Sequence, residues 1–195
     1  MRYPNKINKT ICNNKISHSN RGLSLESDLN ITNEYYRDNK IAIVYKKPTP
    51  VRCVETECIG KKTIIKKAFY EMPSTTDYNG VYKGYYIDFE AKEVRTKAFS
   101  LTNIHEHQLK HLFDVREQGG IAFIIVRFSK IDETYMLDSK VLNNIIKNGE
   151  KSISLDYFKK NGCLVKTNYH PRLDYINSIN MLYFGGKNEH KKNIE

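Results

Sequence analysis

The sequence has no tryptophan, only four cysteines, and no apolar run longer than a β-strand. Its longest uncharged apolar run covers residues 121–126, whereas a membrane-spanning helix needs about 20 such residues. The first residues, Met-Arg-Tyr-Pro-Asn-Lys, lack the apolar segment of a signal peptide. These absences exclude a membrane-spanning protein and a secreted disulfide-rich module, and we expect a cytoplasmic protein with no membrane partner.

The four cysteines form no Cys-x-x-Cys pair. They are Cys12, Cys53, Cys58 and Cys163. The spacing between Cys53 and Cys58 has no matching second pair, so neither a zinc site nor a disulfide framework is expected. We interpret all four as free thiols.

Acidic residues are under-represented, because 32 lysines and arginines face 22 aspartates and glutamates. The resulting net charge of +10 favours a polyanionic partner, with nucleic acid first and an anionic membrane second. A genome biased toward lysine and asparagine codons gives the same surplus. The charge therefore supports nucleic-acid binding without deciding it.

Basic residues without any acidic residue mark residues 1–22, which we interpret as a flexible basic arm. Arg21 stands beside Gly22, just before a helix expected over residues 24–38. A basic residue at a helix N-terminus can bind phosphate, aided by the helix dipole, so Arg21 is a candidate DNA contact. An ordinary helix start with an exposed arginine explains the same pattern.

A second basic segment, residues 46–71, follows an expected buried strand over residues 41–45. It has seven basic residues and three acidic ones, too polar for a core strand. We predict that it projects from the domain and contacts phosphates, as an insertion at about residues 50–73. Its candidate DNA-binding residues are Lys61, Lys62, Lys66 and Lys67.

The remaining pattern alternates strands and helices. A hairpin is expected over residues 74–92, with its turn at Asn79-Gly80, a strong type I′ signal. A helix over residues 104–118 precedes a strand over 121–128 that is buried on both faces. A strand over 133–137 and a helix through residues 141–146 follow. The sequence thus predicts a mixed α/β sheet flanked by helices.

A candidate catalytic group lies in the expected hairpin. Glu90 and Lys92 point to one face of a strand, and Asp77 can join them from the partner strand. Two carboxylates suit a hard cation such as Mg²⁺, and a lysine beside them suits phosphodiester hydrolysis. Asp88 lies on the same face as a competing or additional acid. A cross-strand salt bridge on an exposed strand is the alternative.

Three histidines open the following helix region. His107 and His111 are four residues apart, but the His-Glu-x-x-His pattern of metalloproteases is absent, because residue 109 is Leu. We interpret these histidines as polar residues that line a groove at the helix start.

These residues, taken together, resemble the RecU family of Holliday junction resolvases. The segments that carry the resemblance are Ser19-Asn-Arg-Gly-Leu23, Lys46-Lys-Pro-Thr-Pro50, Ser74-Thr-Thr-Asp-Tyr-Asn-Gly80, Tyr86-Ile-Asp-Phe-Glu-Ala-Lys92, His105-Glu-His-Gln108 and Gly119-Gly-Ile-Ala-Phe123. They occur in order over nearly the whole chain. Departures are one residue fewer between Lys92 and His105, the two cysteines of the basic segment, and a polar tail after about residue 180.

The resemblance implies a restriction-endonuclease-like core with a PD-(D/E)xK site, a protruding basic stalk, and a homodimer that cuts four-way junctions symmetrically. It implies Mg²⁺, with Mn²⁺ as a substitute, at a site formed by Thr75, Asp77, Glu90 and Gln108. Lys92 would stabilise the transition state. The implied organisation is the basic arm, a single nuclease domain over 23–180, and a polar tail over 181–195.

The sequence therefore predicts a structure-selective endonuclease of DNA recombination and repair. Its expected partners are four-way junction DNA, a second copy of the chain, the strand-exchange recombinase and the branch-migration machinery. Two alternatives stay open: a non-catalytic DNA-binding or strand-annealing recombination protein, and a sequence-specific restriction endonuclease. No specificity domain is evident for the second alternative.

Overall fold

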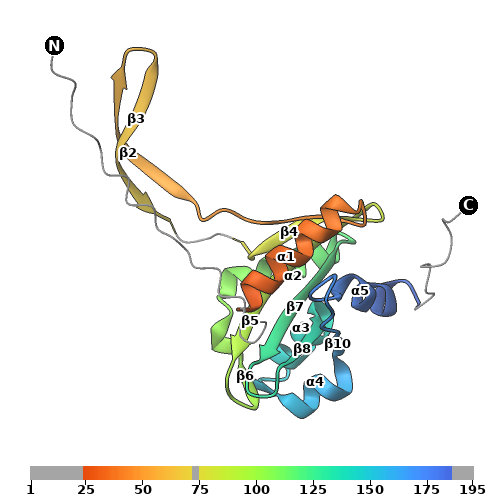
Figure 1. Ribbon diagram of the computed structural model, residues 1–195. Coiled ribbons are helices and arrows are strands. Elements are labelled where there is room, and N and C mark those ends of the chain that lie inside the picture. The colour runs from red at the N-terminus through yellow and green to blue at the C-terminus, as the bar shows by residue number, and fades with distance from the viewer. Residues whose placement is uncertain (1–23, 72–74, 186–195) are drawn as a thin grey trace, which may run out of the picture.

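The computed structural model describes residues 24–71 and 75–185, and its centre is one six-stranded sheet (Figure 1). The strands lie in the order β1 (Ile43–Lys46), β4 (Tyr78–Tyr82), β5 (Tyr85–Val94), β7 (Ile121–Phe128), β8 (Glu133–Asp138) and β10 (Cys163–Val165). β5 and β7 pair in parallel, and the other neighbours pair antiparallel. The predicted mixed sheet is confirmed.

Helices cover both faces of this sheet. One hydrophobic core packs α1 (Leu25–Asp38) and α5 (Tyr175–Tyr183) against the first face. The second core lies beneath α2 (Glu106–Glu117), α3 (Ser139–Lys147) and α4 (Leu155–Asn161). A short 3₁₀ helix η1 (Leu101–Asn103) and a ribbon of β6 (Ala98–Ser100) and β9 (Ser152–Ser154) complete this side.

β7 shows why the sheet needs two helical layers. All eight of its residues are buried, and successive side chains point to opposite faces. Phe123 and Ile125 enter the first core, where Phe123 stacks on Phe89 with ring centroids 4.8 Å apart. Ile124 and Val126 enter the second core. The prediction of a strand buried on both faces is confirmed.

The basic segment forms a hairpin that extends away from the body, as Figure 1 shows. Its strands are β2 (Val51–Ile59) and β3 (Lys62–Tyr70), and every residue in both is exposed. Gly60 occupies the turn with φ +61°, a left-handed conformation that favours glycine. The predicted projection is confirmed, and we call this hairpin the stalk. Its two cysteines, like Cys163, are free.

The predicted turn at Asn79-Gly80 is wrong, because both residues lie inside β4. The chain reverses at Lys83 and Gly84, whose φ values are +49° and +81°. Gly80 lies opposite Val44 of β1, and a Cβ atom there would overlap the main-chain oxygen of Ile43. The glycine that resembles a turn signal instead allows two strands to approach closely.

β1 also differs from the prediction of a buried strand. Only Val44 of its four residues is buried, while Ile43 and Tyr45 are 59% and 55% exposed. β1 is an edge strand of the sheet, with β4 as its single neighbouring strand in the described sheet, and of its four side chains only that of Val44 is buried in the core.

The helix boundaries are close to those expected. Ser24 caps α1 by accepting a hydrogen bond from the Ser27 N–H at 3.2 Å.

α5 continues to Tyr183, three residues past the expected end of the folded domain. Most of the expected basic arm and polar tail lies outside the described residues. No helix within residues 24–71 and 75–185 has both the length and the apolar character needed to cross a membrane.

Candidate active site

Strand pairing brings Asp77 and Glu90 together. Tyr78 pairs with Phe89, so Asp77 at the entrance to β4 lies beside Glu90 of β5. The Asp77 main-chain N–H donates to Glu90 Oε2 at 3.1 Å, and the Ala91 N–H donates to Asp77 Oδ2 at 3.3 Å. Each of these two segments thus holds the carboxylate of the other segment through a main-chain N–H.

Lys92 completes this group on the same face of β5. Its Nζ lies 2.5 Å from Glu90 Oε1, and its side chain keeps 28% of its surface exposed while that of Glu90 is fully buried. The structure therefore places two carboxylates and one partly exposed ammonium in one cluster.

Gln108 reaches the cluster from α2, and it does so through nitrogen. Its Nε2 donates to Glu90 Oε1 at 2.9 Å, while its Oε1 accepts the main-chain N–H of His105 at 3.0 Å. This second bond is half of a capping box that closes the first turn of α2. The side-chain oxygen of Gln108 is thus engaged by the helix cap in this arrangement.

The environment of Glu90 disfavours its charged form. Burial, followed by the nearby charge of Asp77, raises the pKa of Glu90 to about 7, although Lys92 opposes the shift. A nearby positive charge would stabilise the ionised form of this buried carboxyl group. Among residues 24–71 and 75–185, however, no three His, Cys, Asp or Glu side chains are arranged to hold a metal ion together. The acidic donors of the cluster are the pair Asp77 and Glu90.

A second polar cluster surrounds Asp88, two residues earlier on the same face of β5. Asp88 is fully buried. Its Oδ2 lies 2.7 Å from Lys47 Nζ, 2.8 Å from the Tyr86 hydroxyl and 3.1 Å from His111 Nε2. Its Oδ1 accepts a hydrogen bond from the Thr76 hydroxyl. The sequence indicates Asp88 as an additional acid, but it does not reveal these partners.

Thr75 lies outside the hydrogen-bonded clusters, although it is half-buried beside them. Its neighbour Thr76 is the threonine whose hydroxyl reaches Asp88. Two adjacent threonines cannot be distinguished by spacing, because only the local chain direction decides which one points inward.

The four predicted DNA-binding lysines and the side chains of two of the three histidines take no part in either polar cluster. The four stalk lysines are exposed in β3 or the turn before it, on the hairpin that extends away from the body holding the carboxylates (Figure 1). Lys66 pairs with Glu57 at 3.1 Å. Arg21 lies outside the described residues. His105 stacks on His107 with ring centroids 5.4 Å apart, whereas His111 contacts Asp88 instead of joining them.

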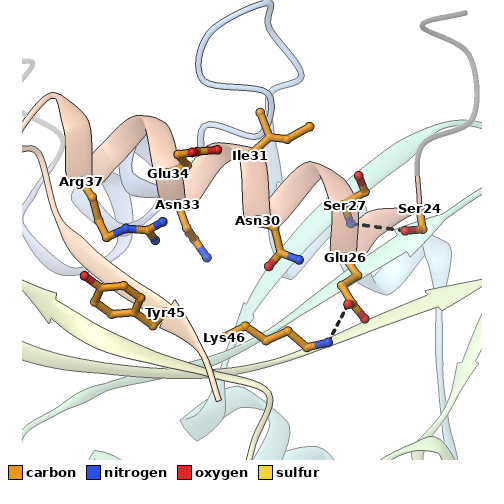
Figure 2. A pocket seen from close by; sticks show the side chains of 10 residues that line it. All are labelled: Ser24, Glu26, Ser27, Asn30, Ile31, Asn33, Glu34, Arg37, Tyr45 and Lys46. Carbon is orange, nitrogen blue, oxygen red and sulfur yellow. Dashed lines mark hydrogen bonds and ion pairs between the residues drawn. The ribbon is translucent and has the colours of Figure 1, made fainter. Parts of the chain in front are cut away.

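A polar groove of about 690 Å³ runs between α1 and the edge strand β1, as Figure 2 shows. Asn30, Asn33 and Arg37 line its helical side, and Tyr45 and Lys46 line the opposite side. The 2.5 Å ion pair between Lys46 and Glu26 lies at one end. Both of these residues also line a smaller hollow that includes Asp77. The groove therefore adjoins the hollow that Asp77 lines.

Residues 20–181 match the family model of RecU, described as recombination protein U. The Holliday junction resolvase RecU of Bacillus cereus strain B4264 is 47% identical over 174 residues, which cover 86% of this chain and 87% of the relative. The chain belongs to the RecU family.

A second RecU relative agrees with this assignment. The protein of the same name from Bacillus thuringiensis strain Al Hakam is 47% identical over 176 residues, covering 87% of this chain and 88% of the relative. A solved structure of Archaeoglobus fulgidus Hjc, a Holliday junction resolvase, aligns at TM-score 0.39 and 11% identity, covering 67% of this chain and 93% of that one. The RecU match includes the stalk and every candidate site residue from Arg21 to Gln108.

Proposed function

We propose that this RecU-family protein is a Holliday junction resolvase, an endonuclease that cuts two opposed strands of a four-way DNA junction. The observation that carries the proposal is the cluster of Asp77, Glu90 and Lys92 within a chain 47% identical to relatives named Holliday junction resolvase. A buried carboxylate beside a half-buried one and a partly exposed ammonium is costly for stability alone, and it suits phosphodiester hydrolysis.

The carboxylate pair fits a hard divalent cation, which we propose to be Mg²⁺, with Mn²⁺ able to substitute. Mg²⁺ is commonly held by one or two carboxylates and retains several waters, so two acidic donors are sufficient. The raised pKa of Glu90 supports the fit. Burial disfavours the charged form of Glu90, and the positive charge of a bound cation would stabilise that form. When bound, the ion would supply an activated water and neutralise charge on the phosphate.

The protein's own residues have distinct proposed roles. Asp77 and Glu90 would hold the cation, and Thr75 would supply a further oxygen from the segment that carries Asp77. Lys92 offers its partly exposed ammonium to the non-bridging oxygens of the phosphate as charge develops on them. Gln108, which the family resemblance implies as a metal ligand, fixes the orientation of Glu90 by donating its amide N–H.

Junction geometry supports a homodimer. A four-way junction has approximate twofold symmetry, so two copies of the chain can place one site on each of two opposed strands. The stalk has exposed lysines, which in the proposed complex would lie where phosphates crowd at the crossover. The strand-exchange recombinase and the branch-migration machinery remain the proposed functional partners.

The alternative is a DNA-binding or strand-annealing protein without catalysis, and one experiment separates the two. Purified protein is incubated with a synthetic four-way junction or linear duplex, with and without Mg²⁺, and each labelled strand is examined on a denaturing gel. We expect paired cuts at symmetric positions in two opposed strands of the junction, only with Mg²⁺. Binding of the junction without any strand cleavage would contradict the proposal.

A further inference from the structure

Asp88 of β5 binds side chains from three other segments of the chain and one side chain of its own strand. Lys47 follows β1, Thr76 precedes β4, Tyr86 lies in β5, and His111 lies in α2. Both oxygens of Asp88 are therefore engaged by protein donors. A buried carboxylate with this set of partners is suited to holding segments in place, in contrast to the Asp77–Glu90 pair.

Lys47 connects this carboxylate to Asp77. Its Nζ donates to Asp88 Oδ2 at 2.7 Å and to Thr76 Oγ1 at 3.0 Å. Its main-chain N–H donates to the carbonyl oxygen of Asp77 at 2.8 Å. One residue thus binds the chain on both sides of the peptide that links Thr76 to Asp77.

Lys47 is also the residue from which the stalk departs. Three residues separate it from β2, and the Glu71 N–H donates to Pro50 O at 3.0 Å, which closes the base of the hairpin. The base of the stalk and the segment carrying Asp77 are therefore anchored at one point, on the Asp88 carboxylate.

We propose that Asp88 and Lys47 form a positioning pair that holds Asp77 in its metal-binding position and fixes the base of the stalk relative to it. This inference rests on the proposed function, because it takes Asp77 as a metal-binding residue. Neither member of the pair touches the reacting atoms. Removing Lys47 leaves the buried Asp88 carboxylate without its lysine counter-charge, and removing the Asp88 charge leaves the largely buried Lys47 ammonium without its carboxylate, so the segment around Asp77 would shift in response.

The test uses the full-length variants Asp88→Asn and Lys47→Met, together with the double variant. Mn²⁺ binding without DNA is followed by electron paramagnetic resonance, and Mg²⁺ dependence by junction cleavage. We expect each single variant to weaken Mn²⁺ binding and raise the half-saturating Mg²⁺ concentration about 5- to 20-fold, with near-saturated rates largely restored at high Mg²⁺. The double variant should be no worse than the more affected single variant, because the pair acts as a unit.

A second readout concerns the stalk. The ratio of junction to duplex affinity, measured in a metal-free buffer, should fall several-fold in Lys47→Met, because the stalk base is no longer anchored. An unchanged ratio would overturn the part of the inference that concerns the stalk.

Asp28→Asn is the matched control. Asp28 is another buried carboxylate in a cationic network, 2.7 Å from Arg127 Nη2 and 3.1 Å from Arg172 Nε, and both of these partners lie outside the cluster of Asp77, Glu90 and Lys92. We expect it to lower the melting temperature without changing Mn²⁺ affinity or the junction-to-duplex ratio. An equal loss of Mn²⁺ affinity in Asp28→Asn would reduce the effect of Asp88 to general destabilisation and overturn the inference.

Wild-type Mn²⁺ affinity in a folded Asp88→Asn protein would also overturn the inference. If that variant fails to fold, Lys47→Met decides the same point, because its side chain is 18% exposed. Should the wild-type protein bind Mn²⁺ yet cut no junction, the proposed function fails, while the comparison of Mn²⁺ affinities still tests the positioning pair.

Discussion

Gln108 contacts Glu90 as a hydrogen-bond donor, with 2.9 Å between its Nε2 and Glu90 Oε1. The oxygen of the same amide accepts the His105 N–H and thereby closes the N-terminus of α2. One side chain therefore links the start of a helix to the most buried acid of the proposed site.

Gln108 can act as a donor that positions Glu90 or as an oxygen ligand of the cation. Two substitutions of Gln108 distinguish these roles. Gln108→Glu keeps oxygen atoms at this position but removes the amide donor and places a second carboxylate against Glu90. If Gln108 positions Glu90, junction cleavage should fall at least 10-fold in both Gln108→Glu and Gln108→Met. Near wild-type cleavage by Gln108→Glu, together with loss in Gln108→Met, would instead identify the residue as an oxygen ligand.

Lys92→Ala should slow single-turnover cleavage by about 10² to 10³, the usual loss for one electrostatic stabiliser. Junction affinity should change little, because one partly exposed lysine is removed from a strongly basic protein. Cleavage is measured with enzyme in excess, and affinity by fluorescence anisotropy with Ca²⁺ in place of Mg²⁺. A variant that loses affinity but retains its cleavage rate when saturated would move Lys92 from chemistry to substrate binding.

The stalk lysines should matter more for a junction than for a duplex, because a cationic projection at the crossover meets more phosphates. The variant replaces Lys61, Lys62, Lys66 and Lys67 with Ala. Its junction affinity should fall steeply, and the slope of log K against log salt should flatten by about 0.9 for each phosphate that the stalk no longer neutralises. The measurement is a salt titration with both substrates.

The control for the stalk variant removes the same charge elsewhere. Lys140, Lys147, Lys151 and Lys160 are exposed on or beside α3 and α4, and replacing them with Ala should affect junction and duplex equally. If the stalk variant also loses affinity equally for both substrates, the stalk is a general phosphate-binding patch and selectivity has another origin.

We expect the protein to sediment as a homodimer at micromolar concentration, because the junction presents two related strands to be cut. Sedimentation velocity with and without a junction provides the measurement. A 22.8 kDa monomer that cuts both strands in concert would contradict this expectation.

Much of the fold can be predicted from local pattern. The strand 121–128 is evident because it is apolar along most of its length, and the stalk is evident because its segment is too charged for a core. The turn cannot be placed in this way, because Asn79-Gly80 carries a strong local signal that close packing on β1 overrides. At Gly80 the local preference for a turn is overridden, because packing against β1 requires a residue without a Cβ atom.

The candidate site is only partly accessible to the same reasoning. Alternation along one strand places Glu90 and Lys92 on a shared face, and hairpin pairing adds Asp77. Lys47 is 41 residues from Asp88, and His111 is 23 residues from it, so no periodicity connects them. Such partners follow from the packing of β1 and α2 against β5, which the sequence does not specify locally.

The central claim is that Asp77 and Glu90 perform metal-dependent cleavage, and it is tested most directly by Asp77→Asn and Glu90→Gln. Each variant keeps the side-chain shape and replaces an ionisable carboxyl group with a neutral amide, so junction affinity measured without Mg²⁺ should match that of the wild-type protein. With Mg²⁺, single-turnover cleavage of the bound junction should be lost in both variants, because the cation is no longer held. A cleavage rate equal to that of the wild-type protein in either variant would contradict the account.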